Sequence, residues 1–318
     1  MQHFLASRQG RDIPIKHLYI EYRQWIEKDH PFANVTIELS ALARQREAFR
    51  RIVAPEPDDP IYDLCTFLEA YDVRTSYPLL LALLEADVDE STWASISTHL
   101  ESYLLRRAVC NLGTKNYNRI FLALTKNLRK DGFTAENVKK LLLEQTGDSG
   151  LWPDDVKFRE AWMHKPLYGP LNSPKLVHLF TKLNRTYMSS KAEALVFAEP
   201  PSVEHLLPQE WIANWKLPDG SKGLTLQELY QASENDPRAI ATRKRDTALQ
   251  CLGNLTILST GLNSAQKNYG WEQKLPVMLK HSLLPLNQSF SNAKTWDEAA
   301  IRDRGEVLFT RALGVWVR

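Results

Sequence analysis

The sequence predicts a mainly α-helical protein, with a helical N-terminal domain over residues 1–172 and an α+β domain over residues 173–318. Apolar residues in the first half recur at helical spacing, and no alternating strand pattern occurs before residue 190. Two short strand patterns follow that point, at residues 202–206 and 255–258. The length of 318 residues also fits two domains, since a domain typically has ~100–200 residues.

The N-terminal domain shows three helix patterns. An apolar stripe at positions i, i+3, i+4 and i+7 follows Pro60, and this spacing places the apolar side chains on one helix face. Pro78 precedes an apolar run at residues 79–84, and the first turn of a helix accepts proline. Phe133, Thr134 and Val138 have the spacing of a hydrophobic staple around an N-cap. The stripe consists of Ile61, Leu64, Cys65 and Leu68.

The expected domain boundary is a turn-rich stretch at residues 152–174, because proline and glycine interrupt helices there. One helix is expected from residue 174 to residue 190, and another from 241 to 252. Thr225 with Glu228, and Thr295 with Glu298, have the spacing of a capping box at a helix start. Tryptophans in the second domain are interpreted as core packing.

Composition excludes several classes of protein. Hydrophobic residues make up 43% and charged residues 25%, as in ordinary globular proteins, so global disorder is excluded. The mean hydropathy is −0.37, and no apolar run approaches the ~18 residues of a membrane-spanning helix. The N-terminus lacks a signal-peptide pattern, and the three cysteines are far apart, which argues against disulfides and a cysteine zinc site. We therefore expect a cytoplasmic protein without membrane association.

The distribution of charge is more informative than the net charge of +2. Residues 102–130 include seven basic side chains and no acidic one, and a shorter basic cluster lies at residues 238–245. Such segments can follow a DNA backbone, although a basic run is also typical of a solvated helix face. The candidate DNA-binding residues in these segments are Arg106, Arg107, Lys115, Arg243, Lys244 and Arg245.

Three short segments of the second domain form a candidate site. They are EHLLPQ at 204–209, GNLTIL at 253–258 and LNSAQKN at 262–268. Each segment alone is weak evidence for a catalytic site, because Gly-Asn is usually a turn and an asparagine after a strand is often an N-cap. Their order is more specific: an acid and a histidine end one strand, an asparagine begins the next, and Asn263 is expected to open the following helix.

This order resembles the ββα-metal, or His-Me finger (HNH), nucleases. It is most similar to the C-terminal nuclease part of GmrSD-type restriction enzymes, where a Trp-x-x-x-x-Ile-x-x-Arg helix follows the motifs. Here that helix would contain Trp296, Ile301 and either Arg302 or Arg304. Residues 103–107 and 114–118 also resemble the helical middle region of that family. The resemblance therefore implies a His-Me finger core within the α+β domain.

The resemblance implies a metal-dependent DNA endonuclease that nicks DNA in restriction or anti-phage defence. It assigns His205 as the general base, and a histidine with an unperturbed pKa of ~6.5 suits that role near neutral pH. Glu204 and Asn263 would bind Mg²⁺, with Mn²⁺ as a substitute, because magnesium prefers hard oxygen ligands. Asn254 would brace the loop that follows His205, and Lys267 would contact a phosphate. Neighbouring residues on a regular strand face opposite ways, so Glu204 and His205 can share one site only if the strand bends.

The resemblance also implies partners. Relatives act on modified phage DNA and use an N-terminal sensor domain that hydrolyses nucleotide. No phosphate-binding loop for nucleotide occurs in this sequence, so that domain or subunit is an expected partner. One site cuts one strand, and a double-strand break would need a homodimer or two events. The alternatives are a DNA-binding or scaffold subunit with a non-functional nuclease fold, and an RNase toxin on the same fold.

Overall fold

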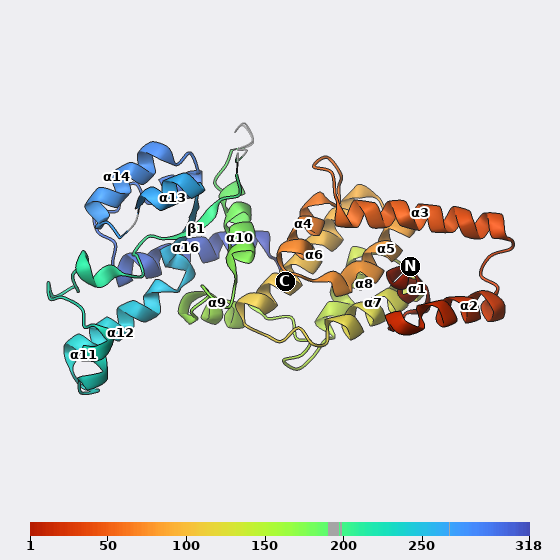
Figure 1. Ribbon diagram of the computed structural model, residues 1–318, viewed down its shortest axis with the longest axis horizontal. Coiled ribbons are helices and arrows are strands. Elements are labelled where there is room, and N and C mark those ends of the chain that lie inside the picture. The colour runs from red at the N-terminus through yellow and green to blue at the C-terminus, as the bar shows by residue number, and fades with distance from the viewer. Residues whose placement is uncertain (190–196, 198, 267) are drawn as a thin grey trace. The chain divides into compact units, whose positions relative to one another are not determined.

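The protein is described by a computed structural model that covers residues 1–318 except 190–196, 198 and 267 (Figure 1). The chain divides into two compact units. Unit 1 comprises Met1–Pro153 and Trp316–Arg318, and unit 2 comprises Asp154–Val315. The division lies 19 residues before the expected boundary at 172/173, because the helix Asp155–His164 packs against the last long helix of unit 2.

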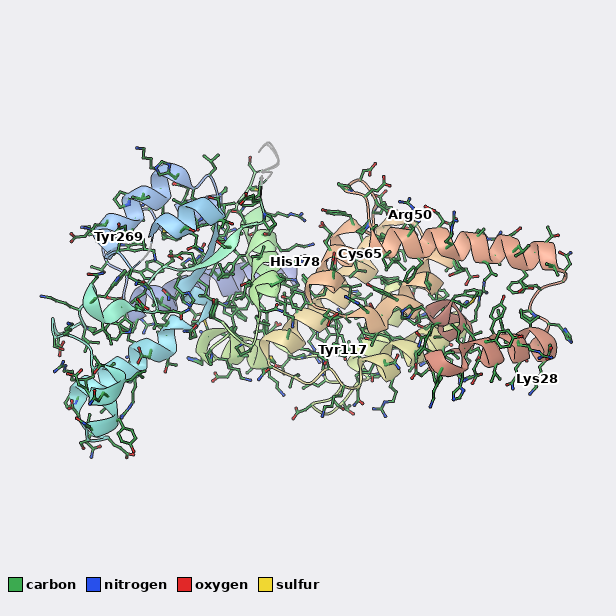
Figure 2. All side chains as sticks on the ribbon, viewed as in Figure 1. Lys28, Arg50, Cys65, Tyr117, His178 and Tyr269 are labelled. Carbon is green, nitrogen blue, oxygen red and sulfur yellow. The ribbon has the colours of Figure 1, made fainter. Side chains whose placement is uncertain are left out.

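Unit 1 is helical throughout its described elements, as the sequence predicts. Thr134 caps its helix by accepting a hydrogen bond from the amide of Asn137, and Pro78 lies in the first turn of α5. Both predictions are confirmed. Cys65 and Tyr117 are buried inside this unit (Figure 2). The helices are α1 (Gln2–Gln9), α2 (Leu18–Asp29), α3 (Val35–Val53), α4 (Tyr62–Ala70), α5 (Tyr77–Glu85), α6 (Glu90–Val109), α7 (Tyr117–Asp131) and α8 (Ala135–Leu143).

The centre of unit 1 is α5, which packs against α1, α3 and α7. Six of its nine residues are buried, since the apolar run after Pro78 leaves no polar face. The apolar stripe after Pro60 is buried as well, and it forms the inner face of α4. The C-terminal half of α6 is also buried nearly all round. The core of unit 1 therefore contains helices that are buried on nearly all sides, in addition to helices that bury one apolar face.

Unit 2 surrounds one pair of strands with helices. The Thr225–Glu228 capping box forms as predicted, whereas the last helix is capped by Asp297, which accepts hydrogen bonds from Ala299 and Ala300. The elements are α9 (Asp155–His164), α10 (Ser173–Arg185), β1 (Ser202–His205), η3 (Trp211–Ala213), α11 (Leu226–Gln231), α12 (Pro237–Leu249), η4 (Leu252–Asn254), β2 (Leu255–Leu258), α13 (Thr260–Gln266), α14 (Trp271–His281), α15 (Pro285–Gln288) and α16 (Glu298–Val315).

The strands β1 and β2 pair antiparallel, in a register that aligns Ser202 with Leu258 and His205 with Leu255. They occupy the two segments in which the sequence predicts strands, and α13 follows β2 after one residue. All four residues of β2 are buried. Over the described residues this is the only sheet with named strands, and the protein is mainly helical, as expected. The central feature of unit 2 is thus a strand, an antiparallel partner and a helix.

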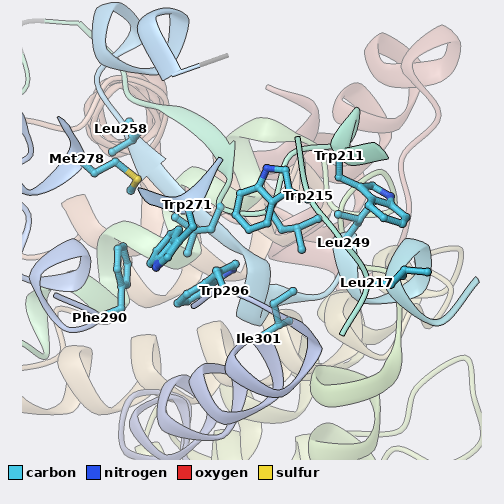
Figure 3. Packing of buried hydrophobic residues seen from close by; sticks show 12 residues of the cluster. Trp211, Trp215, Leu217, Leu249, Leu258, Trp271, Met278, Phe290, Trp296 and Ile301 are labelled. Atoms are coloured by element: carbon cyan, nitrogen blue, oxygen red, sulfur yellow. The ribbon is translucent and has the colours of Figure 1, made fainter. Parts of the chain in front are cut away.

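A tryptophan-rich cluster forms the core beside these strands (Figure 3). Trp271 and Trp296 stack with their ring centroids 4.7 Å apart, and Phe290 packs edge-on against Trp296. Trp211 and Trp215 belong to the same cluster, so the interpretation of these tryptophans as core residues is confirmed. Within the described part of the chain, no helix has both the length and the apolar character needed to cross a membrane.

Candidate active site

Glu204 forms an ion pair at the third position of β1. Its carboxylate contacts the ammonium group of Lys274 on α14, and the Lys274 side chain is completely buried. The same ammonium donates a hydrogen bond of 2.6 Å to the backbone oxygen of His205. Burial raises the pKa of Glu204 and lowers the pKa of Lys274, and the attraction between the two groups opposes both shifts. Lys274 therefore ties α14 to the end of β1.

The imidazole of His205 lies among different neighbours. The Tyr168 ring packs edge-on against it at 4.5 Å between centroids, and Gln250 Oε1 lies 3.2 Å from Nε2. The side-chain nitrogen of Gln209 lies 3.4 Å from Nε2 of the ring and 3.5 Å from Nδ1. Burial, which leaves the residue 7% exposed, lowers the pKa of His205 to about 4, although the bond to Gln250 opposes the shift. The ring is therefore neutral near pH 7. If Gln250 accepts from Nε2–H, this tautomer leaves Nδ1 as the proton acceptor.

The side chains of Glu204 and His205 do not share a set of contacts. The strand stays in register through His205, and side chains alternate between the two faces of a regular strand. Glu204 accordingly contacts α14, whereas His205 contacts Tyr168 and Gln250. The regular pairing from Ser202 to His205 shows no bulge in β1, so within the strand the two side chains keep different neighbours. What connects the two residues is Lys274, through one side chain and one backbone oxygen.

Asn254 holds the segment that follows His205. The side chain is fully buried, and its Oδ1 accepts hydrogen bonds from the Leu207 amide at 2.8 Å and the Trp296 indole at 3.1 Å. Its Nδ2 donates to the backbone oxygens of Leu207 and Leu249, at 2.9 and 3.0 Å. These four bonds use the amide group fully, so Asn254 joins two backbone segments and the tryptophan core. Its position is that of a brace rather than of a group that meets substrate.

Arg304 on α16 holds Asn254 in turn. Its Nη1 donates to the backbone oxygens of Gly253 and Leu255, at 2.8 and 2.7 Å, on both sides of Asn254. Burial lowers the pKa of Arg304 to about 10, which leaves it charged near pH 7. A Cβ at Gly253 would lie 2.0 Å from the Ile301 oxygen, so only glycine allows α16 to approach this closely. The Ile-x-x-Arg spacing thus places Ile301 and Arg304 against the turn before β2.

Asn263 lies inside α13 and does not open it. The helix begins at Thr260, and the backbone amide of Asn263 donates to the Ser259 oxygen, so the prediction that Asn263 opens the helix is wrong. Its Nδ2 donates to Ser202 Oγ at 2.8 Å and to the Val203 oxygen at 3.1 Å. These bonds dock α13 on β1 and point the amide toward the strand that carries Glu204. Lys267 lies outside the described residues.

The donors near Glu204 can be compared with the needs of a metal ion. Over the residues that the structure describes, no group of three or more His, Cys, Asp or Glu side chains is placed to hold a metal. Mg²⁺ commonly takes only one or two protein carboxylates and completes its shell with water and substrate phosphate. The Glu204 carboxylate and the Asn263 amide oxygen, on β1 and the adjoining α13, are such hard donors. A cation bound at Glu204 would compete with the ammonium of Lys274, which already pairs with that carboxylate.

Three of the arginines expected to bind DNA are internal. Arg106 and Arg107 are 1% and 0% exposed and donate to backbone oxygens, including those of Pro153 and Leu151. Arg245 is 2% exposed and pairs with Glu298. Their predicted role at a DNA surface is wrong, because their donors are already used inside the fold. The remaining candidates of the two basic segments, Lys115, Arg243 and Lys244, are exposed.

Sequence reasoning missed Lys274, Gln250 and Tyr168. Gln250 ends α12 just before the Gly-Asn motif, and its backbone oxygen also accepts from the amides of Leu167 and Tyr168. No local signal identifies a lysine 70 residues after Glu204 as its partner. A helix with one lysine on an otherwise apolar face, as in Trp271 to Met278, is the signal that could have suggested a buried charge.

Comparison with protein-family models identifies a match over unit 2. The family model for the C-terminal domain of GmrSD restriction endonucleases matches residues 152–311, half of the chain. The matched range nearly coincides with unit 2 and contains every residue of the candidate site described above. A search of curated proteins finds no match. The chain thus belongs to the GmrSD restriction endonuclease family, whose C-terminal domain it carries over residues 152–311.

Proposed function

We propose that unit 2 is a metal-dependent endonuclease that nicks DNA, with a His-Me finger formed by β1, β2 and α13. The observation that carries the proposal is the position of His205 at the end of β1, between the Lys274 contact on its backbone and the Asn254 brace on the residues after it. Membership in a family of restriction endonucleases supports DNA as the substrate. One such site in each chain would cut one strand at a time.

His205 is the proposed general base. Its ring is neutral near pH 7, and with Gln250 at Nε2 the attacking water would give its proton to Nδ1 by displacing the Gln209 amide, which lies 3.5 Å from that nitrogen. Asn254 and Arg304 keep the backbone around this histidine from shifting, since together they bind the segments before β2 and after β1. Tyr168 covers the ring, so DNA must reach His205 by displacing or flanking that side chain.

Glu204 and Asn263 are the residues that would hold Mg²⁺. When bound, the ion would supply charge stabilisation for the phosphate and the departing oxygen. Lys274 is the competing cation at Glu204, and Asn263 keeps its place through its bonds to Ser202 and Val203. Asn263→Ala should therefore raise the Mg²⁺ concentration needed for nicking, while Asn263→Asp retains an oxygen donor. An Asn263→Ala variant with an unchanged Mg²⁺ titration would remove Asn263 from the metal site.

A second candidate is a DNA-binding subunit that does not cut. Two observations favour it: the Glu204 carboxylate is paired with Lys274, and His205 is 7% exposed. The experiment that separates the two functions incubates the full chain with supercoiled plasmid and with structured RNA, each with Mg²⁺ and with EDTA. Nicked plasmid only with Mg²⁺ supports the endonuclease. Plasmid binding without nicking supports the second candidate, and cleavage of RNA alone contradicts both.

A further inference from the structure

Helix α11 presents a pair of apolar side chains that are almost fully exposed. Leu226 is 85% exposed and Tyr230 is 92% exposed, and their spacing of four residues places them on one face of the helix. None of the six residues of α11 is buried. A large aromatic and a leucine exposed together are more informative than either alone, since single exposed apolar residues are common.

Polar bonds, not core packing, hold α11 in place. Thr225 and Glu228 form the capping box at its start, with 2.7 Å between the Thr225 amide and the Glu228 carboxylate. The Leu224 amide donates to the Thr242 hydroxyl, and the guanidinium of Arg243 donates to the Leu229 oxygen at 3.3 Å. The helix is therefore fixed to α12 at both ends while its apolar face stays free. Figure 2 shows the side chains of α11 standing out beside α12.

The neighbouring surface of α12 has more exposed positive than negative charge, although Asp236 and Asp246 are carboxylates and Arg238 attracts the carboxylates of Asp219 and Glu228. Its exposed ionisable side chains are Arg238, Arg243 and Lys244. The two acids at its ends are used elsewhere, since Asp236 caps the helix and Asp246 accepts from the Trp211 indole. Among the described residues, none of these three cations forms an ion pair with a carboxylate. An apolar pair next to unpaired cations is complementary to a nucleic acid, in which phosphates flank apolar sugar and base surfaces.

The position of this surface relative to His205 suits a long substrate. The α11 segment bonds to Thr242 and Arg243, which precede Gln250 by eight and seven residues, or about 11–12 Å along α12 at 1.5 Å per residue. Because Gln250 contacts His205, a duplex that lies at His205 and follows α12 would also reach this surface. A protein partner is a poorer fit, because two side chains are far smaller than the ~800 Å² that each side of a stable protein interface buries.

We propose that the arm formed by α11 and α12 is a second DNA contact, in which Arg243 and Lys244 bind phosphates and the Leu226–Tyr230 face enters the minor groove. The proposal rests on the proposed function and adds a contact that is independent of charge. Apolar side chains that enter the minor groove contact sugars and insert between base steps. The insertion bends the duplex, and the bent duplex can contact more of the protein surface. The capping box and the Arg243 bond keep this face in position before DNA binds.

The test is fluorescence anisotropy with the full chain in EDTA and a labelled 24-base-pair duplex at several salt concentrations. Leu226→Ala with Tyr230→Ala should raise the Kd about tenfold and leave the salt slope unchanged, because no phosphate contact is lost. Arg243→Ala with Lys244→Ala should lower the slope by up to ~0.9 for each lost contact. Tyr230→Phe keeps the apolar ring and should bind like the wild type. Leu283→Ala, at a leucine 78% exposed outside the arm, is the matched control.

The outcomes separate this inference from the proposed function. A double variant at Leu226 and Tyr230 that binds as tightly as the wild type overturns the inference and leaves the endonuclease proposal standing. A wild-type protein that does not bind the duplex contradicts both. A lower slope in the apolar variant would mean that the cations had moved, which also contradicts an independent apolar contact. Circular dichroism of the variant should match the wild type, since α11 contributes no buried residue.

Discussion

Two pairs of adjacent cations, one pair from each basic segment, lie in opposite environments. In residues 102–130, Arg106 and Arg107 lie in the part of α6 that is buried nearly all round, and they bind backbone oxygens. In residues 238–245, Arg243 and Lys244 are exposed on α12. A run of cations can therefore contact DNA only where the helix has a solvated face. A guanidinium has five donors, which a group of loop carbonyls can satisfy as well as phosphate can.

The largest loss of stability is expected for Arg107→Ala. Arg107 donates to the oxygens of Gly113, Asp148 and Leu151, and its guanidinium lies 5.4 Å from the ring centres of Tyr103 and Tyr117. Removing it leaves several buried acceptors without donors, so the free energy of unfolding should fall by about 3–5 kcal/mol. Urea unfolding measures the change. A variant with wild-type stability and weakened DNA binding would restore Arg107 to the DNA surface.

A smaller loss of stability is expected within α12, where Arg245 lies on the buried face of the helix and Arg243 on the exposed face. Arg245 pairs with Glu298 and lies over the Trp211 ring, so Arg245→Ala should destabilise by about 3 kcal/mol by leaving a carboxylate unpaired. Arg243→Ala should change stability by less than about 0.5 kcal/mol. Adding Glu298→Met to Arg245→Met should recover part of the loss, because no unpaired charge remains. Equal melting temperatures for the two single variants would contradict the assigned burial.

The smallest effect concerns Lys115, an exposed cation in the first basic segment. If it meets a phosphate, Lys115→Ala should lower the salt slope of DNA binding by no more than ~0.9 and leave stability unchanged. An unchanged slope would show that Lys115 does not contact a phosphate.

Local signals predict much of the fold. Pro78, Thr134 and the Thr225–Glu228 box define helix starts because each acts on backbone groups within four residues. The strands at 202–205 and 255–258 are found where short apolar or β-branched patterns stand between turn residues. Asn263 shows the limit of this reasoning. It follows Ser259 and Thr260, and the helix already begins at Thr260.

Contacts between distant residues could not be predicted in the same way. Lys274 is 70 residues from Glu204, and its burial depends on how α14 packs against β1. Arg304 was identifiable from the Trp-x-x-x-x-Ile-x-x-Arg pattern, but its role follows from the carbonyls of Gly253 and Leu255, which a sequence pattern does not describe. The candidate site was therefore predicted as a set of segments, whereas the bonds that connect them required the three-dimensional arrangement.

The central claim is that His205 performs the chemistry of DNA cleavage, and plasmid nicking by His205→Ala tests it most directly. The matched control is His281→Ala, at an exposed histidine on α14 in the same unit. Loss of a general base typically slows a reaction by ~10²–10⁴-fold, so we predict a loss of that size in His205→Ala with unchanged plasmid affinity, and normal nicking by His281→Ala. Nicking by a folded His205→Ala variant at the wild-type rate would contradict the account.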